Sequence, residues 1–126
     1  MSIQEVNQIS MLGLAHVGDA VYELLVRSML CRRENATVQR LHKLAVSYVK
    51  APAQAKAAEK LLPLLSAEEL ALYKRGRNAK VHGVPQNAAV GEYHAATALE
   101  ALFGWLYLLG RRERIEELFR AIVEEG

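Results

Sequence analysis

The sequence contains little of what disulfide-stabilised, proline-rich or disordered proteins require. It has one cysteine, Cys31, and only three prolines in 126 residues, so no disulfide can form within the chain. Aromatic residues account for 6% of the chain, but hydrophobic residues reach 52% and charged residues 24%. This composition is typical of a globular protein and excludes general disorder. A chain of this length can bury one hydrophobic core, and we expect a single domain over residues 1–126.

Long uninterrupted hydrophobic runs are also missing. The most apolar stretch, residues 95–110, is interrupted by Glu100 and is too short for a membrane span. The first residues, MSIQE, lack the positive charge and apolar segment of a secretion signal. Together with the single cysteine, these features lead us to expect a cytoplasmic protein that does not act at a membrane.

Aspartate is almost absent, because the 14 acidic residues include only one aspartate, Asp19. Asp19 lies in the apolar stretch LGLAHVGDAVYELLV, although aspartate is a poor helix former and is seldom buried without a partner. Glu23 follows four residues later and shares a helix face with it. A second isolated acid, Glu100, interrupts the apolar run ATALEALFGWLYLLG.

Two carboxylates on apolar helices have two interpretations. They would repel each other and lose hydration unless they shared a cation, and magnesium fits best because it takes oxygen ligands and often only one or two protein carboxylates. Alternatively, Asp19 caps a local turn after Gly18, or each acid reaches solvent from the edge of its helix. Cys31 and the histidines show no paired spacing for zinc. The residue pattern alone leaves both interpretations open.

The remaining pattern predicts an all-α helical bundle, because apolar residues recur at helical spacing and no strand pattern or internal repeat is present. The predicted helices span residues 9–31, 35–50, 53–62, 66–76 and 92–109, with a last helix after residue 110. In the first of them, one apolar stripe is formed by Leu14, Val17, Val21, Leu24 and Leu25. Ser10 and Asn35 are candidate N-terminal caps, and Ser66 with Glu69 has the spacing of a capping box. Residues 76–91 predict a long loop.

Basic residues are segregated along the chain, although the formal net charge is only +2. No acid interrupts the windows between Glu34 and Glu59 or between Glu69 and Glu92. The first window gives a basic helix side and the second a basic helix end and loop; their candidate residues are Arg40, Lys43 and Lys50, and Lys74, Arg75, Arg77, Asn78 and Lys80. Such segments can bind a polyanion, whereas solvated helix faces are the plain alternative.

Two motifs resemble a known family. GDAVYELLV at residues 18–26 resembles the signature helix of ribonuclease III, and TALEALFGWLYL at 97–108 resembles the second acidic helix of that family. The short chain and RGRNAK at residues 75–80 resemble its single-domain branch, Mini-ribonuclease III. The order and spacing of the motifs match over about residues 9–120. The resemblance implies a ribonuclease III-type endonuclease domain.

In this family, the residues that match Asp19 and Glu100 are catalytic and bind magnesium. The resemblance therefore implies that these two side chains hold Mg²⁺ here. Two further family acids are absent, since the matching positions are Ala15 and Thr97. Thr97, Glu23 and His16 are candidates for supporting the metal ligands, although packing in a dimer is the first expectation for His16.

The resemblance also implies a function. It implies a homodimeric endoribonuclease that hydrolyses phosphodiester bonds in double-stranded or structured RNA, with the 23S ribosomal RNA precursor as the expected substrate. A ribosomal protein is a further candidate partner. This branch lacks a separate RNA-binding domain, so the basic residues named above would contact the RNA. The alternative is a non-catalytic helical RNA-binding or ribosome-associated factor.

Overall fold

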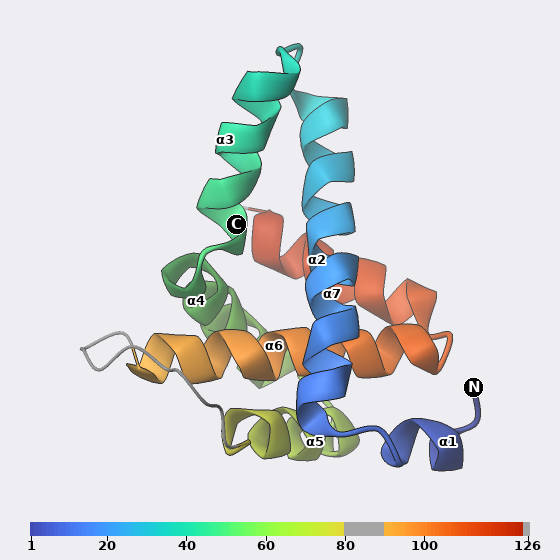
Figure 1. The fold of residues 1–126 in the computed structure, drawn as a ribbon. Helices are drawn as coiled ribbons and strands as arrows, with labels where there is room; N and C mark the ends of the chain where they lie inside the picture. Colours follow the sequence, from blue (N-terminus) through green and yellow to red (C-terminus); the bar gives the residue numbers. More distant parts are fainter. Residues whose placement is uncertain (80–89, 125–126) are drawn as a thin grey trace.

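The computed structural model describes residues 1–79 and 90–124, and its helices are shown in Figure 1. The elements are α1 (Ile3–Asn7), α2 (Met11–Arg33), α3 (Val38–Val49), α4 (Ala51–Leu61), the 3-10 turn η1 (Leu62–Leu64), α5 (Ala67–Arg77), α6 (Val90–Leu108) and α7 (Arg112–Val123). Every regular element in these two ranges is helical, which confirms the predicted all-α class. None of these helices is long and apolar enough to cross a membrane.

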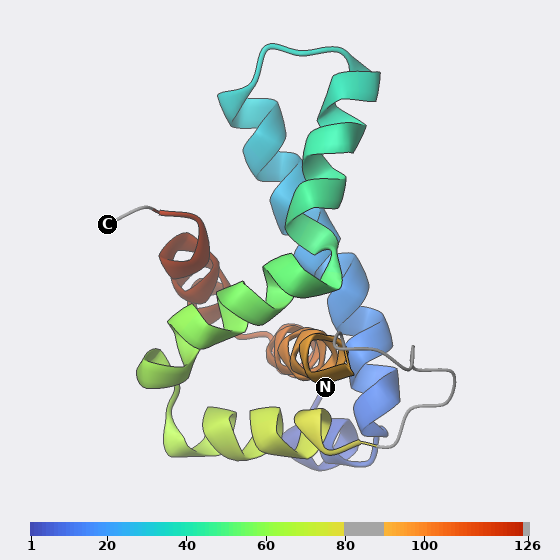
Figure 2. The same cartoon turned by 90° about the vertical axis from the view of Figure 1, so that its left-hand side faces the viewer.

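Helix α6 is the centre of the bundle. Figure 2 looks nearly along its axis and shows α2, α4, α5 and α7 arranged around it. From Ala96 to Leu106, every residue of α6 except Glu100 is buried. Helices α2 and α3 lie side by side and extend away from α6 as a two-helix arm. Glu100, the carboxylate in the middle of α6, is therefore the one residue of this stretch that is not fully buried.

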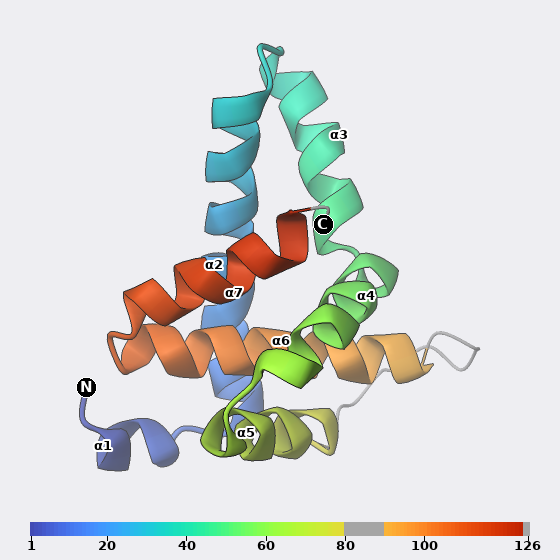
Figure 3. The ribbon, with the colours of Figure 1, turned by 180° about the vertical axis from the view of Figure 1, so that it is seen from behind.

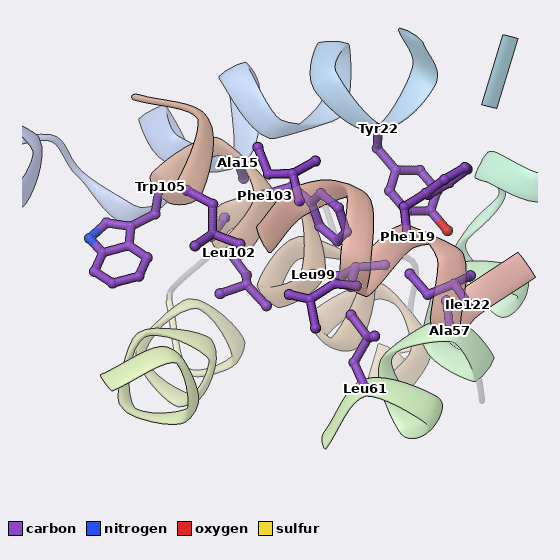
Figure 4. Packing of buried hydrophobic residues seen from close by; sticks show 14 of the residues in the cluster. Ala15, Tyr22, Ala57, Leu61, Leu99, Leu102, Phe103, Trp105, Phe119 and Ile122 are labelled. Atoms are coloured by element: carbon purple, nitrogen blue, oxygen red, sulfur yellow. The ribbon is translucent and has the colours of Figure 1, made fainter. Parts of the chain in front are cut away.

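The core is formed by apolar side chains that all seven helices of the described residues contribute, and Figure 4 shows part of this cluster around α6. The ring of Tyr22 on α2 packs edge-on against Phe103 of α6 and Phe119 of α7, with centroid distances of 5.4 and 5.8 Å. Leu61 of α4 and Leu99 of α6 are buried in the same cluster. Full burial of each such side chain contributes about 1.5–3 kcal/mol. This packing fixes the position of α6 relative to α2 and α4.

Gly110 ends α6 and turns the chain into α7. Its φ of +78° lies in the left-handed region, which glycine adopts without steric cost. The N–H of Gly110 donates to the Tyr107 carbonyl and the N–H of Arg111 to the Leu106 carbonyl, both at 2.9 Å, closing the helix end. The predicted break at this glycine is confirmed. Helix α7 then packs against α4 and α6, and Figure 3 shows it from behind, where it runs in front of α2.

The predicted helix caps are partly confirmed. Ser10 caps α2 by accepting from the Gly13 N–H, and Ser66 forms the predicted capping box with Glu69. The prediction for Asn35 is wrong, because Thr37 accepts from the N–H three residues further on and α3 begins at Val38. Helix α1 was not predicted, although it too begins with a capping box, formed by Ser2 and Glu5. It has only five residues, too few to show an apolar period.

Helix α5 passes Gly76 and ends at Arg77, one residue beyond the predicted end. Gly76 is buried against α6, where a Cβ atom would lie 3.1 Å from the Cα of Ala98. This glycine allows close helix packing rather than ending the helix. The part of the predicted loop from 80 to 89, including Lys80, lies outside the described residues.

The predicted apolar stripe of α2 coincides only in part with its buried face, because Leu14 is buried and Val21 and Leu25 pack against the core. Leu24 is 65% exposed, and Val17 and Val21 are half-buried. The buried face is instead formed by Leu14, Ala15, Gly18, Tyr22, Val26, Met29 and Leu30. Helix α2 therefore buries one apolar face and leaves part of a second one at the surface.

Candidate active site

Helices α2 and α6 cross with their backbones in contact, and glycine on each helix makes this possible. A Cβ atom on Gly18 would lie 1.6 Å from the carbonyl oxygen of Glu100, and one on Gly104 would lie 2.0 Å from that of Leu14. No larger residue fits at either position. The crossing brings Asp19, the residue after Gly18, next to Glu100.

Asp19 and Glu100 are therefore neighbours, as the hypothesis of a shared cation requires. Asp19 is exposed and Glu100 is half-buried, so the pair can be reached from solvent. Burial raises the pKa of Glu100 to about 8, and hydrogen bonding and charge repulsion from Asp19 act in the same direction. Without a cation, burial and the neighbouring Asp19 thus disfavour the charged form of Glu100.

Gln54 of α4 is a third side chain at this pair, and the sequence contains no signal for it. It is 1% exposed, and its Nε2 donates to the carbonyl of Val49 at 3.0 Å and to Oε2 of Glu100 at a longer 3.5 Å. The contact with Gln54 acts against burial and lowers the pKa of Glu100. In an alanine-rich helix, a single glutamine has no periodicity or spacing that marks it as part of a site.

Ala15 and Thr97, the positions where the family resemblance implies further acids, offer no charge to the pair. Ala15 is buried on α2, one turn before Asp19. Thr97 is buried on α6, and its hydroxyl donates to the carbonyl of Tyr93 at 3.1 Å within the same helix. The Thr97 hydroxyl is therefore engaged by its own helix backbone.

Glu23 and His16, the other two candidates for supporting the ligands, have different surroundings. Glu23 accepts a hydrogen bond from Arg27 at 2.7 Å, one turn further along α2. His16 is exposed and lines a hollow of about 370 Å³ whose other walls are Val17, Ala20, Val21, Leu24 and Tyr107. This hollow lies over the exposed apolar side of α2.

The donor set at the helix crossing suits a hard divalent cation. Among the residues described, no group of three or more His, Cys, Asp or Glu side chains could hold a metal, so the candidate site has two such ligands. Asp19 and Glu100 offer two carboxylates, and a cation between them would relieve the repulsion that raises the pKa of Glu100. Magnesium commonly binds through one or two carboxylates and keeps several waters.

The predicted basic residues that the structure describes are all exposed, and they form two surfaces. The arm surface consists of Arg40 and Lys43 on α3 and Lys50 at the corner between α3 and α4. The α5-end surface consists of Lys74, Arg75, Arg77 and Asn78. Asp19 and Glu100 lie on α2 and α6, which pack against α3 and α5 respectively. Both surfaces are therefore carried by helices that pack against the helices of the acidic pair.

Both the sequence and the helical fold of this chain match a known family. The family model for the ribonuclease III domain matches residues 12–111 of the chain, which include both Asp19 and Glu100. A crystal structure of a protein from Fusobacterium nucleatum superposes with a TM-score of 0.81 at 33% identity, covering 90% of this chain and 91% of the other.

Relatives define the group more closely. The chain is 46% identical to Mini-ribonuclease 3 of Symbiobacterium thermophilum, over 90% of this chain and 87% of the relative. It is 47% identical to Mini-ribonuclease 3 of Brevibacillus brevis over the same shares of the two chains. The chain therefore belongs to the ribonuclease III family and, within it, to the Mini-ribonuclease 3 group.

Proposed function

We propose that this chain is a magnesium-dependent endoribonuclease that hydrolyses phosphodiester bonds in double-stranded or structured RNA. The observation that carries the proposal is the juxtaposition of Asp19 and Glu100 at the crossing of α2 and α6. In a member of the ribonuclease III family, we expect such a pair to hold the catalytic magnesium ion. The ribosomal RNA precursor, 23S in particular, is the substrate that the Mini-ribonuclease group suggests.

Asp19 and Glu100 would hold the magnesium ion through their carboxylate oxygens. When bound, magnesium supplies Lewis-acid activation of water and stabilises negative charge on the phosphate. The chain contributes the fixed placement of the two carboxylates, because the backbone contact at Gly18 leaves the crossing of α2 and α6 little freedom. Both residues serve as ligands in this proposal and not as carriers of protons.

RNA binding would use the arm surface and the α5-end surface. Exposed lysine and arginine side chains contact phosphates of a duplex, and A-form RNA is recognised largely by its shape and 2′-hydroxyls. Arg40 and Lys43 would act from the arm, and Arg75 and Arg77 from the end of α5. We expect such contacts to favour double-stranded RNA with little dependence on sequence. A ribosomal protein that presents the RNA would be compatible with this mode of binding.

The active enzyme would be a homodimer that forms over the hollow on α2. Leu24 is 65% exposed and Tyr107 41% exposed, and an exposed apolar patch of this kind is typical of a protein interface. His16 lies in the same hollow, in keeping with a packing role in the dimer. Two-fold pairing suits a duplex, because the two strands present equivalent phosphates to two equivalent sites.

Incubation of the protein with a long RNA duplex, with and without magnesium, tests this function. We expect cleavage into short duplex fragments only when the metal is present, and little cleavage of a single strand of the same sequence. Duplex binding with no cleavage, over a range of salt and of divalent ions, would contradict the enzyme and favour the non-catalytic RNA-binding factor.

A further inference from the structure

We infer that Gln54 is a positioning residue that holds the Glu100 carboxylate in place for the metal. The inference rests on the proposed function, because it assigns a role toward the same pair of acids. Gln54 comes from α4, whereas Asp19 and Glu100 come from α2 and α6. A third helix thus reaches the site through this one side chain.

The amide of Gln54 has its donor side turned toward two oxygen atoms. Its Nε2 donates to the Val49 carbonyl at 3.0 Å and to Oε2 of Glu100 at 3.5 Å. A flipped amide would direct Oε1 at these two acceptors, and oxygen would then face oxygen. The two acceptors therefore determine the orientation of the amide.

This orientation has a cost, because it leaves the other end of the amide without a partner. Oε1 of Gln54 is buried and has no hydrogen-bond partner among the described residues. Buried polar groups are nearly always paired, so an unpaired one calls for an explanation. In this residue, which is 1% exposed, the orientation of the amide is therefore set by the two contacts that Nε2 makes, with Val49 and with Glu100.

The contact with Val49 explains how Gln54 itself is held. Val49 is the last residue of α3, and the final carbonyls of a helix have no partner within the helix. Gln54 satisfies this carbonyl, so the amide is anchored to the corner between α3 and α4. From that anchor, Nε2 reaches Oε2 of Glu100, and the 3.5 Å contact should shorten when Glu100 is ionised, since bonds to charged acceptors are shorter.

The side chains one turn before Asp19 and three residues before Glu100 do not orient the pair of acids. Neither Ala15 nor Thr97 provides a charged or free polar group for the pair. A neutral donor orients Glu100 without adding a third negative charge beside Asp19. Partners of this type, which orient a metal ligand, typically change metal affinity or activity by about 10–100-fold when they are removed.

The test measures Mn²⁺ binding to the RNA-free protein by calorimetry, together with duplex binding in EDTA. For Gln54→Met, which has similar length but no donor, we expect Mn²⁺ affinity to fall on the order of tenfold and duplex affinity to stay unchanged. The magnesium concentration for half-maximal cleavage should rise by a similar factor. Asn7→Leu is the matched control, because Asn7 is an amide that binds α6 elsewhere, through Nε1 of Trp105 at 3.3 Å. It should leave Mn²⁺ binding unchanged.

A second variant and the wild-type protein complete the test. Gln54→Asn keeps the amide but shortens it by one methylene, and it should weaken Mn²⁺ binding even if Gln54→Met does not fold. Wild-type Mn²⁺ affinity in either folded variant would overturn this inference while leaving the proposed function intact. A wild-type protein that binds no Mn²⁺ and cleaves no duplex would instead overturn the proposed function, and the inference with it.

Discussion

Arg114 of α7 donates two hydrogen bonds to the carboxylate of Glu69 on α5, from Nε to Oε2 at 2.9 Å and from Nη2 to Oε1 at 2.7 Å. The Glu69 side chain is only 5% exposed, and the same arginine donates to the carbonyl of Leu64. Glu69 also closes the capping box of α5 with Ser66. This one ion pair therefore ties the start of α5, the helix that carries one basic surface, to the start of α7.

The ion pair between Glu69 and Arg114 predicts that the fold loses stability in acid. Hydrogen bonding by Arg114 lowers the pKa of Glu69 in the folded state from its ordinary value of 4.5. The pair therefore stabilises the fold fully above pH 4.5, and this stabilisation is lost as the pH falls through the lower, folded-state pKa. Glu69→Gln should cost about 2 kcal/mol at pH 7 and flatten the acid side of the stability profile, measured by urea unfolding.

Glu117→Gln is the matched control for this pair. Glu117 also contacts Arg114, but its side chain is 65% exposed. An exposed ion pair contributes less than about 1 kcal/mol. A loss from Glu117→Gln as large as that from Glu69→Gln would show that burial of Glu69 is not what makes its pair important.

The helix crossing predicts a strong effect of adding one methyl group. Gly18→Ala places a Cβ where the Glu100 carbonyl oxygen already lies, so α2 and α6 must separate, at a cost of about 3 kcal/mol. Gly91→Ala is the control, since its Cβ position on the exposed start of α6 has no atom within 4 Å apart from its chain neighbours and the backbone of its own helix. It should be neutral or stabilising by up to about 1 kcal/mol. Equal urea midpoints for the two variants would contradict the crossing.

The α5-end surface predicts a change in salt dependence. Arg75→Gln and Arg77→Gln should each weaken duplex binding without divalent ions and reduce the slope of log affinity against log salt by about 1. Arg120→Gln removes an exposed charge from α7, outside both basic surfaces, and should leave the slope unchanged. If the Arg75 and Arg77 variants kept the wild-type slope, RNA recognition would lie elsewhere.

The hollow over α2 predicts how the proposed dimer can be broken. Leu24→Glu places a charge in the centre of the exposed apolar patch and should convert a dimer to a monomer in sedimentation velocity. Val38→Glu alters an even more exposed apolar residue, 81% exposed, outside that hollow. It should remain dimeric. A Leu24→Glu protein that sediments as a dimer would place the interface on another face.

Helices α2 to α7 and the positions of two isolated acids on them were predictable from the sequence, because these signals are local. Helical spacing, the capping box at Ser66 and the isolation of Asp19 and Glu100 in apolar runs are each contained in a short segment. The face of α2 that enters the core was not predictable. Helix α2 is apolar on more than one side, so periodicity could not separate buried Tyr22 from exposed Leu24.

The contacts between helices distant in sequence could not be predicted either. Nothing near Gly18 indicates that its missing side chain makes room for the backbone of α6. In the same way, Gln54 becomes part of the site only because α4 packs across α6. Each role depends on tertiary packing, for which a single sequence contains no local signal.

Asp19→Asn tests the central claim most directly, in an assay of duplex cleavage with magnesium together with duplex binding without it. The variant removes the charge of one proposed ligand but keeps its shape, so we expect cleavage to fall on the order of a hundredfold or more while folding and duplex affinity persist. Glu23→Gln, whose carboxylate is paired with Arg27, should cleave like the wild-type protein. Cleavage by Asp19→Asn at the wild-type rate would contradict the assignment of Asp19 and Glu100 as the metal site.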